Sequence, residues 1–133
     1  MHCHRNLVDL KTGREVWSVK TGGTIYTVPL VVGDMVYVGS TDKSLYVLDL
    51  KRREIHTKMQ GNSKIFCPPA SINGYVYFGS CDGSIYRINP KTVSIDGKHQ
   101  LPDAITNKIA YSSRNNLYYA LTYTNQLFAL RSM

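Results

Sequence analysis

The chain has 133 residues, a formal net charge of +7 and a hydrophobic share of 43%. This length suits one domain, and a folded chain of this size buries roughly two thirds of its unfolded surface. No apolar stretch approaches the roughly 20 residues of a membrane helix, so we expect no membrane-spanning segment.

The first ten residues, MHCHRNLVDL, contain no sustained apolar segment and no small-residue cleavage pattern. We therefore expect a cytoplasmic location for the chain as written, and a periplasmic or secreted one if a signal lies upstream. His2, Cys3 and His4 are the best candidate metal ligands, because imidazole and thiolate suit zinc or copper. No fourth ligand lies nearby in the sequence and chain termini are mobile, so we predict no metal site there.

The three cysteines, Cys3, Cys67 and Cys81, are odd in number and lack the pair spacing of metal or redox sites. We expect buried free thiols rather than a disulfide framework. The positive net charge would assist association with acidic polymers. Basic residues are scattered except at Lys51, Arg52 and Arg53, where a predicted turn favours a solvated hairpin over a phosphate site.

A repeat of about forty residues organises the chain. VYVGS from Val36 recurs as VYFGS from Val76, and LYYAL from Leu117 matches as a third copy, which gives spacings of 40 and then 41. LYVLDL from Leu45 likewise recurs as IYRINP from Ile85 and LFALRS from Leu127. Repetition at this period is typical of propellers and solenoids.

Alternating β-branched and aromatic residues predict strands within each copy. In the first full copy the predicted strands are 25–32, 35–40, 44–50 and 54–59, and the pattern returns forty residues later. Tight turns are expected at Gly33-Asp34, Asn73-Gly74 and Asp82-Gly83, because these dipeptides tolerate positive φ. The third copy has SSRNN at the first of these turns, one residue longer.

Each copy is predicted to be an antiparallel meander of four strands, A to D. Pro29 and Pro69 fall in strand A, and because proline cannot donate to a ladder, this strand should be a sheet edge. The innermost strand of a propeller blade is such an edge, whereas a closed barrel has none. A β-sandwich is the main rival, but it predicts no forty-residue repeat.

The predicted fold class is therefore all-β, with four-stranded antiparallel blades of a β-propeller. Three repeats of about 40 residues would form a partial or oligomer-completed ring. The predicted layout is an outer strand at 9–20, blades at 24–60 and 64–100, and an incomplete blade at 104–131.

The stretch DLKTGREVW from Asp9 to Trp17, followed by YTVPLVVGDMVYVGSTDKSLYVLDL, resembles the repeat of PQQ-like (quinoprotein-like) β-propellers. That repeat combines an Asp, a Thr-Gly turn, an outer-strand Trp, an inner-strand proline and two strands of the VYVGS and LYALD types. The resemblance covers nearly the whole chain and implies the propeller fold. Family members include pyrroloquinoline quinone dehydrogenases, a periplasmic lipoprotein of the outer-membrane assembly machinery, and propeller domains of larger enzymes.

The family's outer-strand Trp packs between blades, and this chain departs from that pattern. Trp17 is matched by His56 or Thr57 in the second copy and has no clear counterpart in the third. Aromatic residues that recur in strands B and C are expected to supply a replacement core. These are Tyr37, Tyr77, Tyr118, Tyr46, Tyr86 and Phe128.

The ends of the repeat suggest two arrangements. Counting one strand D, two full copies and one copy without strand D gives 12 strands. The chain could be the C-terminal piece of a longer propeller. Alternatively, two chains could exchange strands and complete a six-bladed ring as a homodimer, because the surplus strand D of one could fill the vacancy in the other.

Catalytic chemistry finds little support in the sequence. The resemblance implies that a quinone dehydrogenase needs a base, a calcium site and planar groups such as adjacent cysteines, and the chain has no vicinal cysteines and one Trp. Asp9, Asp49 and Asn89 occupy equivalent repeat positions, which indicates structural turns. We predict no catalytic, cofactor-binding or metal-binding residues.

The leading hypothesis is a non-catalytic scaffold for protein–protein interaction, or an accessory propeller domain of a larger protein. The alternatives are a fragment of a quinone-dependent dehydrogenase and a basic surface for an acidic polymer, with nucleic acid disfavoured. Loops on a repetitive scaffold carry function. We therefore expect the binding surface on one face, formed by the turns between strands B and C and by the connections between strands D and A, one of which contains Gly22-Gly23. The predicted interaction residues are Asp42, Lys43, Asn62, Ser63, Asp82, Asn125 and Gln126. Lys51 to Arg53 should lie on the opposite face.

Overall fold

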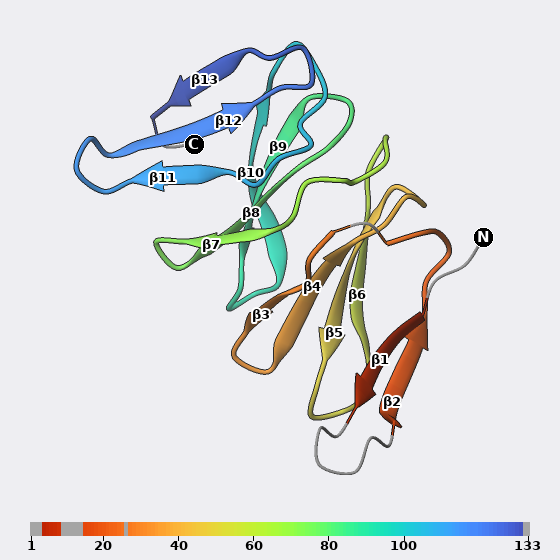
Figure 1. The fold of residues 1–133 in the computed structure, drawn as a ribbon. Helices are drawn as coiled ribbons and strands as arrows, with labels where there is room; N and C mark the ends of the chain where they lie inside the picture. Colours follow the sequence, from red (N-terminus) through yellow and green to blue (C-terminus); the bar gives the residue numbers. More distant parts are fainter. Residues whose placement is uncertain (1–3, 9–14, 26, 132–133) are drawn as a thin grey trace.

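The computed structural model of the chain describes residues 4–8, 15–25 and 27–131. In these ranges the regular secondary structure consists of β-strands joined by turns (Figure 1). The prediction of an all-β fold is therefore confirmed.

Two four-stranded antiparallel sheets lie in the middle of the molecule. The first contains β3 (Leu30–Val32), β4 (Met35–Gly39), β5 (Ser44–Asp49) and β6 (Glu54–Gln60), and the second contains β7 (Ala70–Ile72), β8 (Tyr75–Gly79), β9 (Ser84–Asn89) and β10 (Ser94–Gln100). Strand order follows chain order in both sheets. Each sheet is thus the predicted A-to-D meander.

Smaller sheets flank this pair. At one side β1 (His4–Val8) pairs with β2 (Glu15–Lys20), and at the other β11 (Ala110–Ser112), β12 (Leu117–Leu121) and β13 (Leu127–Leu130) form a three-stranded sheet. The described residues therefore form 13 strands, one more than the 12 predicted. The additional strand is β1, and because β2 is hydrogen-bonded to it, β2 is not an unpaired surplus strand.

The inner strands are shorter than predicted. Strand β3 begins at Leu30 and β7 begins at Ala70, so Pro29 and Pro69 lie just before these strands and not within them. A proline has no N–H for the ladder, so pairing begins only after it. The edge position predicted for this strand is confirmed, because β3, β7 and β11 each lie at the edge of their sheet.

The third copy is shifted by one residue relative to the predicted alignment. Leu30 pairs with Tyr37 and Ala70 with Tyr77, but the equivalent Ala110 pairs with Tyr119 and not with Tyr118. The cause is the turn before β12, which spans four residues, 113–116, where the other two copies use two. From the second copy to the third the spacing is therefore 40 for strand A but 42 for strands B and C, so the value of 41 predicted for strand B was wrong.

A one-residue shift sends side chains to the opposite face of a strand. Tyr118 occupies the position of Val76 and points toward the second sheet, where its ring lies 5.0 Å from that of Tyr77. Tyr119 takes the position of Tyr37 and Tyr77, on the opposite face of the third sheet. Tyr37, Tyr77 and Tyr118 are all buried, as expected of core residues, but Tyr118 is not in register with the other two.

Two hydrophobic clusters join neighbouring sheets. Between the first and second sheets lie Tyr37, Leu45, Val47, Ile65, Val76, Phe78 and Ile88. Between the second and third lie Cys67, Tyr77, Ile85, Leu101, Ile105, Ile109, Tyr118 and Ala120. Each fully buried aliphatic side chain contributes about 1.5–3 kcal/mol, so these clusters hold the sheets face to face.

Glycine in strand B permits this close contact. A Cβ atom on Gly39 would lie 2.5 Å from Ile65 Cγ2, and one on Gly79 would lie 2.5 Å from Ile105 Cγ2. The backbone repeats the contact, because the N–H groups of Ile65 and Ile105 donate to the carbonyls of Ser40 and Ser80 at 3.2 and 3.1 Å. Ile65, just before the second sheet, thus packs on the first sheet, and Ile105, just before the third, packs on the second.

The strand pairing also identifies the counterparts of Trp17. Trp17 pairs with Leu7, and the equivalent partners in the next two sheets are Thr57, opposite Val47, and Gly97, opposite Arg87. Thr57, and not His56, is therefore the equivalent residue.

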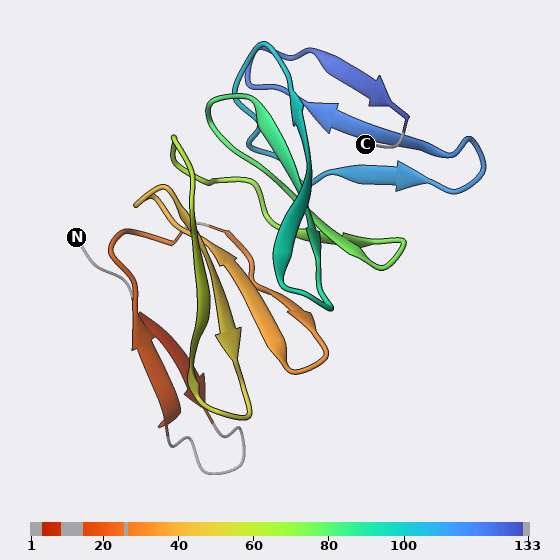
Figure 2. The ribbon, with the colours of Figure 1, turned by 180° about the vertical axis from the view of Figure 1, so that it is seen from behind.

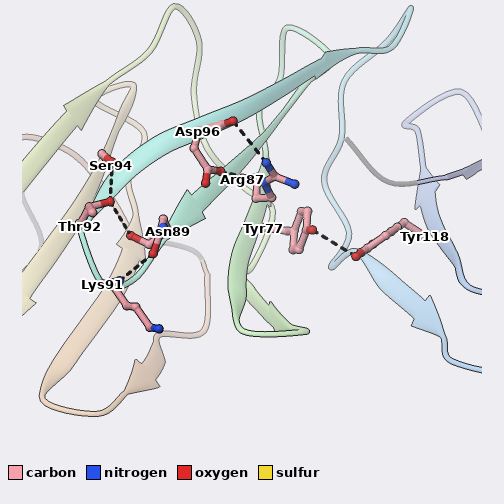
Figure 3. A network of polar contacts seen from close by, with 8 residues as sticks. All are labelled: Tyr77, Arg87, Asn89, Lys91, Thr92, Ser94, Asp96 and Tyr118. Carbon is pink, nitrogen blue, oxygen red and sulfur yellow. Dashed lines mark hydrogen bonds and ion pairs between the residues drawn. The ribbon is translucent and has the colours of Figure 1, made fainter.

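At Gly97 the Arg87 side chain occupies the space that a larger residue would need. A Cβ atom there would lie 3.3 Å from Arg87 Nε. The guanidinium donates to the Asp96 carboxylate at 2.7 Å and lies 4.7 Å from the centre of the Tyr75 ring. Figure 3 shows the Arg87–Asp96 pair beside Tyr77 and Tyr118. The hydroxyl oxygens of these two tyrosines lie 3.2 Å apart.

Candidate interaction surface

The turns that contain the predicted interaction residues lie together at one end of the sheets. The β4–β5, β8–β9 and β12–β13 turns share this end with the β6–β7 and β10–β11 connections, whereas the β3–β4, β5–β6 and β7–β8 turns lie at the other (Figures 1 and 2). We call the first group the B–C end. It contains all seven predicted residues and Gly22-Gly23.

At the first of these turns, Asp42 builds local structure. Its carboxylate accepts hydrogen bonds from the backbone N–H groups of Gly22, at 3.2 Å, and Ser44, at 3.0 Å. The Tyr46 hydroxyl also donates to this carboxylate and accepts from the Gly22 N–H. The side chain of Asp42 thus holds the turn against the preceding connection and is only partly available to a partner.

Asp82 is held in a similar way. Its carboxylate accepts from the Ser84 N–H at 2.9 Å, and its carbonyl accepts from the Gln100 side chain at 2.6 Å. Burial alone would raise the pKa of Asp82, but hydrogen bonds from Ser84 and Ser80, together with the charge of Lys98, outweigh burial and lower the pKa. Asp82 is therefore ionised at neutral pH.

Lys43 and Asn125 occupy the position of Gly83, and all three have positive φ, at 75°, 67° and 88°. Lys43 is exposed, and its carbonyl accepts from the Gly61 N–H at 2.7 Å. In the adjoining connection, Asn62 is exposed and Ser63 is half-buried beside a small recess of about 20 Å³. The exposed members of the predicted set are thus Lys43, Asn62, Asn125 and Gln126.

The β12–β13 turn differs from the other two because apolar side chains surround it. Tyr123 is 75% exposed, Leu127 67% and Leu121 37%, and they adjoin the predicted residues Asn125 and Gln126. Sequence reasoning missed these three residues. The signal was present, because in the correct register Leu121 stands where Gly39 and Gly79 stand, which places a leucine at a position that packs tightly in the other copies.

The basic turn lies at the opposite end, as predicted. Lys51 forms an ion pair with Asp34 at 3.3 Å and Arg52 one with Glu54 at 3.9 Å, and all four side chains are more than half exposed. Two of the three cations of this turn are therefore paired with carboxylates. Because these carboxylates offset part of the positive charge, the surface at this turn is only weakly basic.

Two open cavities lie near the β7–β8 and β11–β12 turns, away from the B–C end. One of about 460 Å³ lies between β7 and β11 and is lined in part by Asn73, Lys108 and Tyr111. Another of about 420 Å³ is lined by Asn115, Asn116, Leu117, Tyr118 and Arg131. Neither contains any of the predicted interaction residues.

The structure also shows the surroundings of two predicted turn residues and of one cysteine. The Asp49 carboxylate accepts from the N–H groups of Lys51 and Arg52, and Asn89 accepts from that of Lys91, as expected for structural turns. Burial raises the pKa of the Cys67 thiol to about 11, so this cysteine is not a nucleophile at neutral pH.

Some predictions fall beyond the residues that the structure describes. Asp9 and the first two residues of the His2–His4 cluster lie outside the described residues. Within the described residues, no three His, Cys, Asp or Glu side chains lie close enough to hold a metal ion. None of the described segments forms a helix long and apolar enough to cross a membrane.

The sequence matches the family described as outer membrane protein assembly factor BamB over residues 4–131. The chain belongs to the BamB family. This membership, together with the four-stranded sheets, establishes the β-propeller fold and the PQQ-like repeat that the sequence resembles.

Solved structures agree with the β-propeller fold. The crystal structure of BamB from Moraxella catarrhalis superposes with a TM-score of 0.79 at 21% sequence identity, covering 92% of this chain and 38% of that one. The computationally designed Ika4 protein gives 0.74 at 16% identity, covering 96% of this chain and 79% of Ika4. At these identities the likeness concerns the fold. A comparison with curated proteins finds no match.

Proposed function

We propose that this chain is a non-catalytic β-propeller scaffold that binds other proteins. The observation that carries the proposal is the cluster of exposed apolar side chains, Leu121, Tyr123 and Leu127, on a member of a family described by its role in outer membrane protein assembly. Large exposed aromatic and aliphatic residues beside polar turns are typical anchors of protein interfaces.

The proposed contact surface is the B–C end around the third sheet. Tyr123 and Leu127 would be the apolar anchors, and Asn125 and Gln126 would supply polar contacts at the rim. The residues predicted at the other two turns, Asp42, Lys43, Asn62, Ser63 and Asp82, would extend this surface. Among them, Asp42 and Asp82 would act mainly by holding the turns in place.

The family description also favours action at the outer membrane. We therefore propose the periplasmic location over the cytoplasmic one, with any signal lying upstream. Labelling an epitope-tagged full-length protein in intact cells, before and after the outer membrane is permeabilised, tests this location. Labelling only after complete lysis would contradict it.

The test of the binding role compares two sets of substitutions with matched exposure. The tagged chain is cross-linked in cells that express it, and the cross-linked proteins are identified by mass spectrometry. Tyr123→Ser combined with Leu127→Ser should reduce recovery of a specific partner by at least about tenfold, since such anchors carry most interface energy. Val28→Ser, at a side chain 70% exposed in the connection between β2 and β3, is the control and should leave recovery unchanged.

Two results would contradict the proposal. One is equal recovery of every partner by the double variant and the wild-type chain. The other is reduction of an electron-acceptor dye after the chain is supplied with pyrroloquinoline quinone and calcium, which would favour the dehydrogenase alternative.

A further inference from the structure

The open cavity of about 460 Å³ between β7 and β11 lies at the end of the sheets opposite the B–C end. Its walls are two inner strands and the residues that adjoin them, all of which the structure describes. Small-molecule sites in proteins usually enclose about 300–1,000 Å³. The cavity is therefore large enough for a small organic ligand, and it is separate from the proposed interaction surface.

A cation lines this cavity at a position where the other copies of the repeat have none. The inner strands align on their first residues, which are Leu30, Ala70 and Ala110. Lys108 then stands where the earlier copies have Val28 and Pro68, so the blade framework does not require a charge there. Among the described residues Lys108 forms no ion pair, and residues 104–131 contain no Asp or Glu. Its ammonium group is therefore available to an external anion.

The backbone on both sides of Lys108 is anchored. Before it, the Cys67 thiol donates to the Asn107 carbonyl at 3.0 Å, and this thiol stays protonated because burial raises its pKa to about 11. After it, Ile109 is buried in the cluster between the second and third sheets. The Lys108 side chain itself is exposed and lines the cavity. Its cation is thus presented from a fixed point of the wall.

Tyr111 supplies an apolar wall that is also fixed. Its hydroxyl donates to Asn116 Oδ1 at 2.5 Å, and its ring centre lies 4.8 Å from that of the Tyr118 ring. The equivalent residues of the earlier copies are Val31 and Ser71, so this ring, like the Lys108 cation, appears once in the repeat. The cavity therefore combines one cation with one aromatic surface.

Polar groups complete the lining. The Asn73 amide donates to the Tyr118 hydroxyl at 3.4 Å, which orients it. Ser71 and Ser113 are exposed, and the structure shows no hydrogen bond of their hydroxyls within the described residues. Hydroxyls and an ammonium group donate to the oxygens of an anion. One ammonium balances one negative charge, which favours a carboxylate over a phosphate monoester of charge near about −2.

We propose that the cavity between β7 and β11 binds a small organic carboxylate that carries an apolar group. The carboxylate accepts hydrogen bonds from the Lys108 ammonium and from the serine hydroxyls, and the apolar group packs on Tyr111 and Ile72, which also line the cavity. This inference goes beyond the partner-binding role proposed above, because it concerns the other end of the sheets and a small ligand.

The probe is hydrocinnamate, which has one carboxylate and one phenyl group, and its uncharged amide is the matched control. Each is titrated into the isotope-labelled full chain, and binding is followed by the chemical shifts of the backbone amides. Hydrocinnamate should shift residues 71–73 and 108–113 in a saturable way and leave the equivalent residues 31–33 unchanged. The amide should bind at least about tenfold more weakly, because it lacks the charge.

Removal of the cation tests the role of Lys108. Lys108→Gln should weaken hydrocinnamate binding at least about tenfold, since a charge-assisted hydrogen bond is lost. Lys91→Gln removes an equal charge from an exposed turn between β9 and β10 and should leave binding unchanged.

Addition of a carboxylate to the cavity gives a second, independent test. Ser71→Asp places a negative charge on the cavity wall and should also weaken binding, because like charges repel. Val31→Asp is its matched control, at the equivalent position of the first sheet, where the side chain is 59% exposed. It should leave binding unchanged. Both positions are exposed, so both variants should keep the chemical shifts of the folded chain elsewhere.

Several results would overturn the proposal. These are equal binding of hydrocinnamate and its amide, full binding by Lys108→Gln, and chemical-shift changes centred on Lys51 to Arg53 in place of the cavity. Tighter binding of phenyl phosphate than of hydrocinnamate would overturn the assignment of a carboxylate. Because no protein partner is used, failure of this assay leaves the proposed function standing, and the reverse also holds.

Discussion

Two tyrosines at equivalent positions have different surroundings. The hydroxyl of Tyr77 meets that of Tyr118 at 3.2 Å, whereas the buried hydroxyl of Tyr37 has no hydrogen-bond partner among the described residues. The difference arises at the facing position, which is Tyr118 in the third sheet and Val76 in the second. Burial raises the pKa of both tyrosines, so both are neutral at physiological pH.

Removing each hydroxyl should therefore have different effects on the free energy of unfolding. Tyr77→Phe should cost about 1 kcal/mol because it breaks a buried hydrogen bond, whereas Tyr37→Phe should be neutral or stabilising. Urea denaturation of the two variants measures this difference. A larger loss for Tyr37→Phe than for Tyr77→Phe would show that the Tyr37 hydroxyl has a partner.

Two glycines with positive φ also have different surroundings. A Cβ atom on Gly83, at φ +88°, would lie 2.3 Å from the Leu101 carbonyl oxygen, whereas one on Gly33, at φ +60°, would meet no atom within 4 Å. Gly33→Ala should cost about 1 kcal/mol from the left-handed backbone alone, and Gly83→Ala at least about twice that. Thermal unfolding of the pair tests this; equal melting temperatures would contradict the packing of this turn.

At the scale of elements, each B–C turn is tied to the connection that precedes its sheet. The N–H groups of Thr41, Cys81 and Tyr123 donate to the carbonyls of Thr24, Lys64 and Ala104 at 2.8–3.0 Å. In the third sheet the Asp103 carboxylate adds a bond from the Thr124 N–H at 3.0 Å. Hydrogen bonds from Ala104 and Thr124 lower the pKa of Asp103.

A lowered carboxyl pKa gives the folded state a stability that depends on pH. Because the pKa of Asp103 is lower in the folded chain than in the unfolded one, its contribution is complete above the ordinary value near about 4 and is lost as the pH falls through the folded value. Asp82 behaves in the same direction. Asp103→Asn should flatten the loss of stability below about pH 4, as followed by urea unfolding at several pH values. An unchanged acid profile would contradict the role of this carboxylate.

Sequence periodicity predicts the strands well but the ends and registers of elements less well. Alternation and the Gly33-Asp34 and Asn73-Gly74 turns locate the meanders, because these features are local. The register of β12 depends on a turn whose length the letters SSRNN do not determine, and one residue of error moved Tyr118 to the wrong face. The exposed cluster of Leu121, Tyr123 and Leu127 was missed for the same reason, since its significance depends on that register.

At the scale of the whole molecule, a ring-completing homodimer is one of the two arrangements that the repeat suggests. The proposed exchange requires a free outer strand, but β2 is already paired with β1, and exchange would break that ladder. We therefore expect a mass near 15.0 kDa by light scattering in dilute solution, with association rising with concentration because of the open edge of β13. A dimer that persists on dilution would favour the homodimer.

Among the described residues the chain is a set of propeller blades, and in the third of them no strand pairs with the outer edge of β13. Amide hydrogen exchange of the free chain tests this arrangement most directly. We expect slow exchange in the paired strands at Leu45, Val47, Ile85 and Arg87. The Thr122 N–H donates to the Gln126 carbonyl at 2.9 Å, so even-numbered residues of β13 exchange hydrogen bonds with β12. In β13 we expect slow exchange at Phe128 and Leu130 and fast exchange at Leu127 and Ala129. Slow exchange at all four residues of β13 would mean that its edge is already covered, and slow exchange at only Leu127 and Ala129 would contradict the register of the third sheet.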